Sequence, residues 1–320
     1  METEVALACI SVDLDSLIHY SRIHALPDSL LDRRARLLVY SVALPRFRDL
    51  FASAGMPATL FAIGEDLRDA QAAVALREAG ASGLEVANHS FGHDYRLAHR
   101  PDYSIADDIE RGRQAIQSAV GERPVGFRAP GYVLSAAIYG ALCRGEYLYD
   151  SSVFPAVPYY AAKAAVLGGL AVLGRPSSAQ LDSPRVLLAP RHPYFPDPTS
   201  PYRRGVGPVL ELPIATAPFS RIPFIGTFVT TMPKPIVQIV YRTMRQMPFF
   251  NFELHGIDLL DAADGVPTQL ARRQRDLLIP WARKRARLEE ALRWLDHDYS
   301  TVTLAQAATQ WRNRPSCSNS

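Results

Sequence analysis

The sequence predicts an α/β fold in which about seven strands alternate with helices. Short apolar runs rich in β-branched residues recur along the chain and read as buried strands. Stretches with helical spacing of apolar residues separate them, and polar or titratable side chains follow several of the strands directly. This pattern suits either a barrel-like fold or an open doubly wound sheet, and no internal repeat is visible.

Composition limits the classes of protein to which the chain can belong. With 320 residues, 48% of them hydrophobic, it can bury one barrel-sized core or two smaller ones. A net charge of +3 is too small an excess to indicate a nucleic-acid partner. The three cysteines (Cys9, Cys143 and Cys317) are widely spaced, which favours neither a disulfide framework nor a cysteine-rich zinc site. The acidic start, residues 1–4, is unlike a secretory signal, so we expect a cytoplasmic protein.

The first half of the chain shows the alternation clearly. In residues 31–54, Phe47, Leu50, Phe51 and Ala54 form a helical apolar stripe, with Pro45 in its first turn and Gly55 as its cap. Ser104 is the expected N-cap of a helix that runs to residue 120. We expect strands at residues 5–12, 59–63 and 83–87, and helices at 31–54, 70–79 and 104–120.

The second half continues the pattern around an insertion that we expect at residues 155–208. That region holds the apolar stretch 159–174, which carries Lys163 and is shorter than the ~20 residues of a spanning helix. It therefore predicts a buried or partly lipid-facing helix. We expect strands at 147–149, 186–189, 209–214 and 249–254, helices at 135–144 and 269–296, a helix after Pro235, and a last strand and helix at 301–311. One domain would span residues 1–311, followed by a disordered tail at 312–320.

Candidate site residues follow the predicted strands. Asp13 and Asp15 follow the first strand and would point to one side of an extended backbone. His89 and His93 are four residues apart, so a helical turn would bring both imidazoles to one metal ion. Arg128 and His255 also follow strands. The carboxyl ends of strands in such folds open into the loops that carry active sites.

These side chains suit metal-assisted hydrolysis of an amide. Two imidazoles with either Asp13 or Asp15 make a three-ligand site that leaves a position for water and substrate. The other aspartate could accept the proton of that water, with Arg128 holding it ionised. A backbone N–H in the turn at residues 130–132 could bind the oxyanion, and His255 could protonate the departing amine.

In order, the motifs Asp13-Leu14-Asp15, His89-Ser-x-x-His93, Arg128-x-Pro130-Gly131-Tyr132 and Leu254-His255 resemble those of the polysaccharide deacetylase family. The separated aspartates are similar to a subgroup related to peptidoglycan deacetylases and allantoinase-like amidohydrolases. Other segments, among them 149–155 and 211–213, are similar to deacetylases of exopolysaccharide export systems.

This resemblance implies a distorted (β/α) barrel and a role for each motif residue. Asp13 would be the general base, tethered by Arg128, and His255 the general acid. The resemblance also implies that Asp15, His89 and His93 bind zinc or another divalent transition metal, and that Tyr132 offers its backbone N–H. Pro130, Gly131 and Glu211 are candidate substrate-binding residues, Glu211 being equally suited to a structural ion pair.

Two departures from the family pattern stand out. The aspartate that orients the catalytic histidine has no clear counterpart, with Asp150 and Asp258 as candidates. Gly256-Ile257 replaces the usual aromatic residue and proline after His255.

Three functions remain open from the sequence. The first is a metal-dependent hydrolase that removes an N-acetyl group from an amino sugar or a glycan intermediate, including a lipid-linked one. The second is an amidohydrolase of the same fold that cleaves a formyl, ureido or cyclic-amide group of a small metabolite, with or without metal. The third is a non-catalytic carbohydrate-binding protein, which would need neither Asp13 nor His255. We also expect a homo-oligomer; membrane association is compatible with the sequence but not indicated by it.

Overall fold

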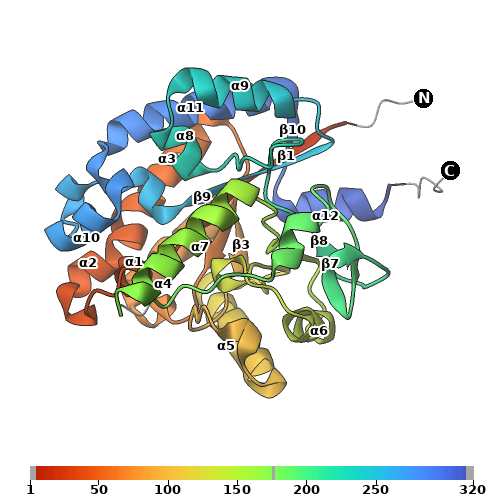
Figure 1. The fold of residues 1–320 in the computed structure, drawn as a ribbon, viewed down its shortest axis with the longest axis horizontal. Coiled ribbons are helices and arrows are strands. Elements are labelled where there is room, and N and C mark those ends of the chain that lie inside the picture. Colours follow the sequence, from red (N-terminus) through yellow and green to blue (C-terminus); the bar gives the residue numbers. More distant parts are fainter. Residues whose placement is uncertain (1–4, 175–176, 315–320) are drawn as a thin grey trace.

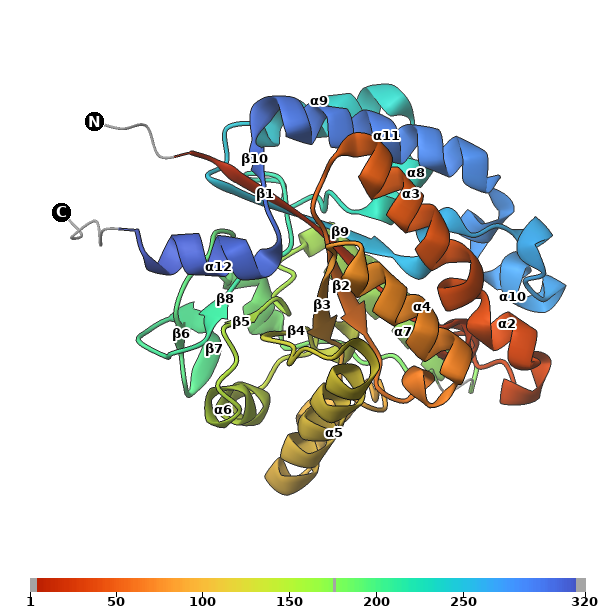
Figure 2. The same cartoon turned by 180° about the vertical axis from the view of Figure 1, so that it is seen from behind.

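A single curled sheet organises the computed structural model, which describes residues 5–174 and 177–314. Within these ranges the sheet has eight strands, all parallel (Figure 2). They are β1 (Leu7–Asp13), β2 (Thr59–Ala62), β3 (Glu85–Asn88), β4 (Gly126–Phe127), β5 (Tyr149–Asp150), β8 (Leu210–Glu211), β9 (Phe249–His255) and β10 (Ser300–Thr301).

The strand β1 is the centre of this sheet, and all seven of its residues are buried. It pairs with β9 along its whole length, while β2 pairs with its carboxyl end and β10 with its amino end. From β2 the sheet continues through β3, β4 and β5 to β8. Just after β8, the Ala215 N–H donates to the Asn251 carbonyl of β9 at 3.0 Å, so the sheet curls back on itself. The predicted distorted barrel is confirmed, and the open doubly wound alternative is wrong.

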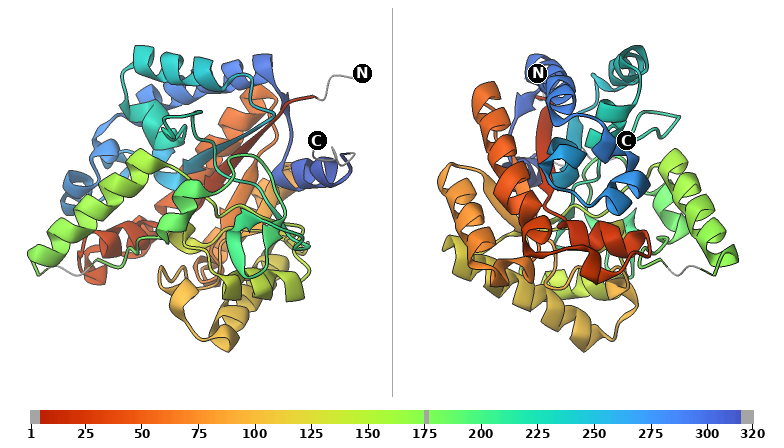
Figure 3. Two further views of the ribbon diagram at one scale, coloured as in Figure 1. Left: turned by 45° about the vertical axis from the view of Figure 1, so that its right-hand side comes forward. Right: turned by 90° about the vertical axis from the view of Figure 1, so that its left-hand side faces the viewer.

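Helices surround the sheet (Figures 1 and 3). They are α1 (Leu17–Ile23), α2 (Arg33–Leu38), α3 (Leu44–Ala54), α4 (Ala70–Ala81), α5 (Asp102–Val120), α6 (Ala136–Arg144), α7 (Val157–Val172), α8 (Gly226–Thr231), α9 (Lys234–Met244), α10 (Thr268–Arg273), α11 (Trp281–Asp298) and α12 (Leu304–Arg312). A small antiparallel hairpin, β6 (Pro196–Asp197) and β7 (Ser200–Arg204), lies apart from the main sheet. No helix in the described ranges is long and apolar enough to cross a membrane.

The helix α3 shows how sequence pattern becomes packing. Pro45 lies in its first turn, and Gly55 ends it with a φ of 66°, as predicted. Phe47, Leu50 and Phe51 are buried in the main core, each burial contributing about 1.5–3 kcal/mol. Ala54, the expected fourth member of the stripe, is exposed.

Several predicted element boundaries are wrong, each for a local reason. Residues 31–54 form two α-helices joined by a π-helical turn at Val39–Ala43. Residues 269–296 are divided because Pro280 lacks an N–H, so α11 starts only at Trp281. The predicted strand at 186–189 lies mostly in a 3-10 helix, Pro184–Leu188, and Ser104 does not cap α5, which begins at Asp102 after Pro101. The predicted disordered tail began at residue 312, but Arg312 still belongs to α12. Residues 1–4 and 315–320, which include Cys317, lie outside the described part of the chain.

Candidate active site

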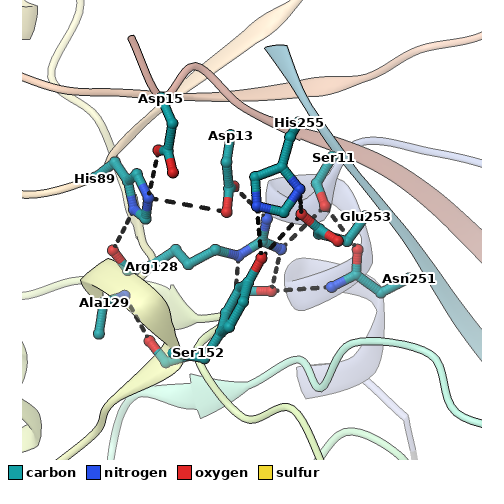
Figure 4. A network of polar contacts seen from close by, with 12 residues as sticks. Ser11, Asp13, Asp15, His89, Arg128, Ala129, Ser152, Asn251, Glu253 and His255 are labelled. Atoms are coloured by element: carbon teal, nitrogen blue, oxygen red, sulfur yellow. Dashed lines mark hydrogen bonds and ion pairs between the residues drawn. The ribbon is translucent and has the colours of Figure 1, made fainter. Parts of the chain in front are cut away.

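The carboxyl ends of β1, β3 and β9 meet at one edge of the sheet and bring the predicted residues together (Figure 4). Because β1 and β9 pair in register, Asp13 lies directly opposite His255. The strand β3 ends at Asn88, so His89 follows it into the same region. Asp13, Asp15, His89 and His93 are all at most 6% exposed. Burial of four titratable side chains in one place is costly unless they are paired or bind an ion.

Asp15, His89 and His93 form a compact triangle of ligand atoms. The Asp15 Oδ1 atom lies 3.3 Å from His89 Nε2 and 3.2 Å from His93 Nε2, and the two nitrogens are 3.2 Å apart. Ligand atoms around a tetrahedral zinc ion, each about 2.0–2.1 Å from it, would be separated by about 3.3–3.4 Å. The spacing of these three atoms therefore fits a divalent metal ion.

The protonation of the residues in this triangle also fits a metal site. His89 Nδ1 lies 2.8 Å from the Arg128 carbonyl, which can only accept, so this nitrogen carries the proton and Nε2 faces Asp15 and His93. Burial alone would raise the pKa of Asp15, but His93 and His89 hold it well below its usual range. Asp15 Oδ1 is buried and accepts no hydrogen bond from the described residues. A carboxylate oxygen that accepts no hydrogen bond and lies beside two imidazole nitrogens has the donor chemistry of a divalent metal site.

The two histidines converge through an irregular loop, and the helical turn assumed from their spacing is wrong. Ser90 and His93 both have left-handed backbones, with φ of 66° and 47°. Asp108 of α5 accepts hydrogen bonds from the Phe91 and Gly92 N–H groups at 3.0 and 3.1 Å. Such strained conformations persist only where surrounding contacts hold them, as Asp108 does here.

Arg128 lies beneath Asp13, as the sequence predicts. Its guanidinium is fully buried and donates to Asp13 Oδ1 at 2.6 Å. The remaining donors reach the Ser151 carbonyl and the Ser11 and Ser151 hydroxyls, and Asn251 joins both serines (Figure 4). All three guanidinium nitrogens are therefore hydrogen-bonded, which fixes the position of the Asp13 carboxylate.

The residue that orients His255 is Glu253, which the sequence analysis did not identify. Its carboxylate Oε1 accepts from His255 Nδ1 at 2.9 Å and from the Tyr132 hydroxyl at 3.0 Å. Burial alone would lower the pKa of His255, but Glu253 outweighs it and raises that pKa well above its usual value. The signal was present in the strand alternation, since residues two apart on β9 share a face.

Neither acid suggested from the sequence contacts the His255 ring. Asp258 accepts from the His255 backbone N–H at 2.9 Å and caps the following 3-10 helix. Asp150 lies beneath the loop after β5, where its carboxylate accepts from Ser152. Burial raises the pKa of Asp258 and of Asp150, each to about 6.

The turn at residues 130–132 contributes differently from the prediction. The Tyr132 N–H donates to the Ala129 carbonyl at 3.0 Å, so it is engaged inside the turn and is not free for an oxyanion. Its hydroxyl instead lies 3.1 Å from His255 Nε2. Gly131 lines the cavity described below, whereas Pro130 is buried and does not.

Glu211 does not reach this site. It is fully buried and its Oε1 atom accepts from the Val153 N–H at 2.9 Å. Burial raises its pKa well above the usual value, and the neighbouring Asp150 adds to the effect. Glu211 does not line the cavity described below; it supports the loop after β5.

One cavity of about 320 Å³ opens onto these groups. Asp13, Asp15, His89 and His255 line it, together with Gly131 and Tyr132. Tyr20 of α1 also lines it. Its neighbour His19 packs its ring against His93, with centroids 4.2 Å apart, and burial lowers the pKa of His19 well below its usual value.

Comparisons with known proteins give the same picture. Residues 39–141, which include the histidine loop and Arg128, match the sequence model of the family described as polysaccharide deacetylase. The predicted resemblance to polysaccharide deacetylases is confirmed.

Solved structures share the fold of this chain. A structure from Mycobacterium smegmatis assigned to the polysaccharide deacetylases is 16% identical with a TM-score of 0.62, covering 98% of this chain and 92% of the other. PuuE allantoinase is 14% identical with a TM-score of 0.56, covering 98% and 93%. Identities this low show the fold alone. No curated protein gives a match.

The family match supports the predicted enzyme class, a deacetylase-type hydrolase that acts on amide bonds. The triangle of Asp15, His89 and His93 supports a divalent metal ion.

Proposed function

We propose that this protein is a metal-dependent hydrolase that removes the N-acetyl group of an amino sugar. The observation that carries the proposal is the placement of two opposed proton-transfer groups beside the metal-ligand triangle. Side-chain ligand atoms of Asp13, Glu253 and His255 lie within 4.8 Å of one another, next to the triangle. A base, an acid and a cation site therefore surround one small space at the base of the cavity.

Asp15, His89 and His93 would hold the metal ion. A divalent ion bound there, such as Zn²⁺, would polarise the amide carbonyl and lower the pKa of a water molecule.

The Asp13 carboxylate is placed to accept the proton of the attacking water. Its Oδ1 atom is held by Arg128, and its Oδ2 atom lies 3.8 Å from His89 Nε2, on the side of the triangle. Because the guanidinium bonds Oδ1, Oδ2 is left to face the attacking water.

His255 is placed to protonate the departing amine. With Nδ1 bonded to Glu253 and Nε2 facing the Tyr132 oxygen, the ring has a partner for each proton of an imidazolium. Because Glu253 raises its pKa, His255 is charged near neutral pH and can act as an acid. As the amide C–N bond breaks, the Nε2 proton passes to the sugar nitrogen.

An assay of released products tests the proposal. We expect acetate release from N-acetylated amino sugars, lost with chelator and restored by a divalent transition metal. Release of formate or ammonia from other amides, with or without chelator, would instead support the second function considered from the sequence. Binding of acetylated sugars without any release would support the non-catalytic alternative.

A further inference from the structure

The active-site cavity continues far beyond the catalytic groups along one face of α7. Tyr159, Ala162, Lys163, Val166, Leu167 and Leu170 of this helix line it. Their spacing is that of one helical stripe, and the eleven helical rises from Tyr159 to Leu170 span about 16 Å. Tyr159 packs against Tyr132, with ring centroids 6.3 Å apart, so this end lies at the catalytic groups. The stripe therefore leads away from the amide site. Its length is about half the ~30 Å thickness of the hydrocarbon core of a lipid bilayer.

The far part of the cavity has apolar walls and no catalytic side chain. Val166, Leu167 and Leu170 line this part together with Ile23 of α1. The polar residues that also line it are His24, Gln274 and Ser177. His24 Nε2 lies 2.9 Å from Gln274 Oε1, and the Ser177 hydroxyl donates to the Ile23 carbonyl at 2.8 Å. Lys163, the one charged residue of α7, is turned toward the near end, where its Nζ donates to the Gly131 carbonyl at 3.2 Å. A sugar ring needs polar partners along its length, whereas the few polar side chains of this channel already hydrogen-bond within the protein.

The outer face of α7 is apolar as well. None of its residues is fully buried, and Val157 and Val172, which do not line the cavity, are 43% and 88% exposed. Val166 of the cavity wall is itself 60% exposed. A helix that only covers a soluble domain normally carries polar residues on its solvent side. Exposed apolar surface that is continuous with a ligand cavity indicates that the ligand itself is apolar there.

Positive charge lies beside the far end of the cavity. Gln274 lines the cavity there, and the side chains on both sides of it, Arg272, Arg273 and Arg275, are exposed. Within the described residues, none of the three forms an ion pair with an acidic side chain. Exposed cations next to an apolar opening suit the anionic head groups of a lipid surface.

We propose that the α7 cavity binds the aliphatic chain of a lipid-linked amino sugar whose amide lies at Asp13 and His255. The identity of the amide in this proposal rests on the proposed function. The binding of the aliphatic chain does not depend on it. The chain would run along Val166, Leu167 and Leu170 and leave past Gln274. The bilayer that holds such lipids would face the exposed end of α7.

Binding of glycosides with different alkyl chains tests the proposal. We would measure the affinities of the methyl and octyl glycosides of N-acetylglucosamine by calorimetry, below the concentration at which the octyl compound forms micelles. An advantage of at least about tenfold for the octyl compound is expected, since each buried methylene can contribute up to about fourfold. Leu170→Asn should reduce this ratio to below about threefold. Val172→Asn, on the same helix but outside the cavity, should preserve it.

Equal affinities of the wild-type protein for the two glycosides would overturn the proposal, as would an octyl advantage that survives in Leu170→Asn and Leu167→Asn alike. Vesicles distinguish a chain taken from a bilayer from one taken from solution. Sedimentation with phosphatidylglycerol vesicles that is lost in Arg272→Glu/Arg273→Glu would support the bilayer. A higher affinity for the octyl glycoside without any vesicle binding would overturn the claim that the chain is taken from a bilayer.

The same compounds separate this proposal from the proposed function. Octyl-dependent binding without acetate release would contradict deacetylation and leave the chain site standing. Acetate release at equal efficiency from both glycosides would support deacetylation and contradict the chain site.

Discussion

At the scale of single residues, the structure divides the predicted site into a metal triangle and two proton-transfer groups with separate supports. Asp13 is held by Arg128 and His255 by Glu253, and the two supports come from different strands. Removing one group should therefore leave the others in place.

Asp13→Asn should keep metal binding and lose turnover by about 10²–10⁴-fold, because asparagine cannot accept the proton of water. His89→Ala should lose both, since it removes a ligand. Metal content by atomic emission and kcat on one substrate would check this pair. An active Asp13→Asn protein with bound metal would contradict the assignment of the base.

Glu253→Gln should move the alkaline limb of the pH profile to lower pH. The acid must be protonated to act, so activity falls as pH rises through the pKa of His255, and Glu253 raises that pKa. Loss of the carboxylate returns the pKa toward the ordinary histidine value, so the limb moves down with it. NMR titration of the His255 ring would measure the shift directly. An unchanged limb would exclude Glu253 as the positioning residue.

At the scale of elements, the histidine loop depends on close packing against α5. A Cβ atom on Gly112 of this helix would lie 2.5 Å from Asn88 Oδ1 and 2.8 and 2.9 Å from backbone atoms of Ser90 and Phe91. The loop can approach the helix this closely only because residue 112 is glycine. Its strained conformation and its metal geometry thus depend on a residue that is distant in sequence.

Gly112→Ala should lower the free energy of unfolding by about 1–3 kcal/mol and weaken metal binding, because the backbone of the loop must shift. Gly168→Ala is the matched control, since a Cβ atom there has no atom within 4 Å. It should be neutral or stabilise α7 by up to about 1 kcal/mol, the usual effect in a helix. Thermal unfolding and metal titration would measure both. Equal effects of the two substitutions would contradict the packing argument.

At the scale of the whole molecule, the fold was predictable because the spacing of apolar residues along the sequence distinguishes its strands from its helices. Asp13, His89, Arg128 and His255 could be placed near one another because each follows a strand of a parallel sheet. Glu253 was missed although it lies two residues before His255, since on a buried strand it looked like part of the core. Glu211 was misplaced because the end of a strand does not determine which side of the sheet its side chain faces. The loop at 88–93 could not be predicted, since its shape depends on contacts with Asp108 and Gly112.

Metal binding should be visible in the stability of the whole chain. Three buried ligand atoms that face one another favour the folded state only when a cation lies between them, so a bound metal stabilises the fold. At a metal concentration of 100 times Kd the gain would be about 2.7 kcal/mol, a rise of several degrees in Tm. His89→Ala should lose this rise and His99→Ala, which is exposed, should keep it.

Acetate release from an N-acetylated amino sugar, measured with chelator and again after metal is restored, tests the central claim most directly. We predict release that stops on chelation, returns with a divalent transition metal, and is absent in Asp13→Asn even when its metal site is full. Acetate release that is indifferent to chelator would contradict the metal site, and release of formate or ammonia without acetate would contradict deacetylation.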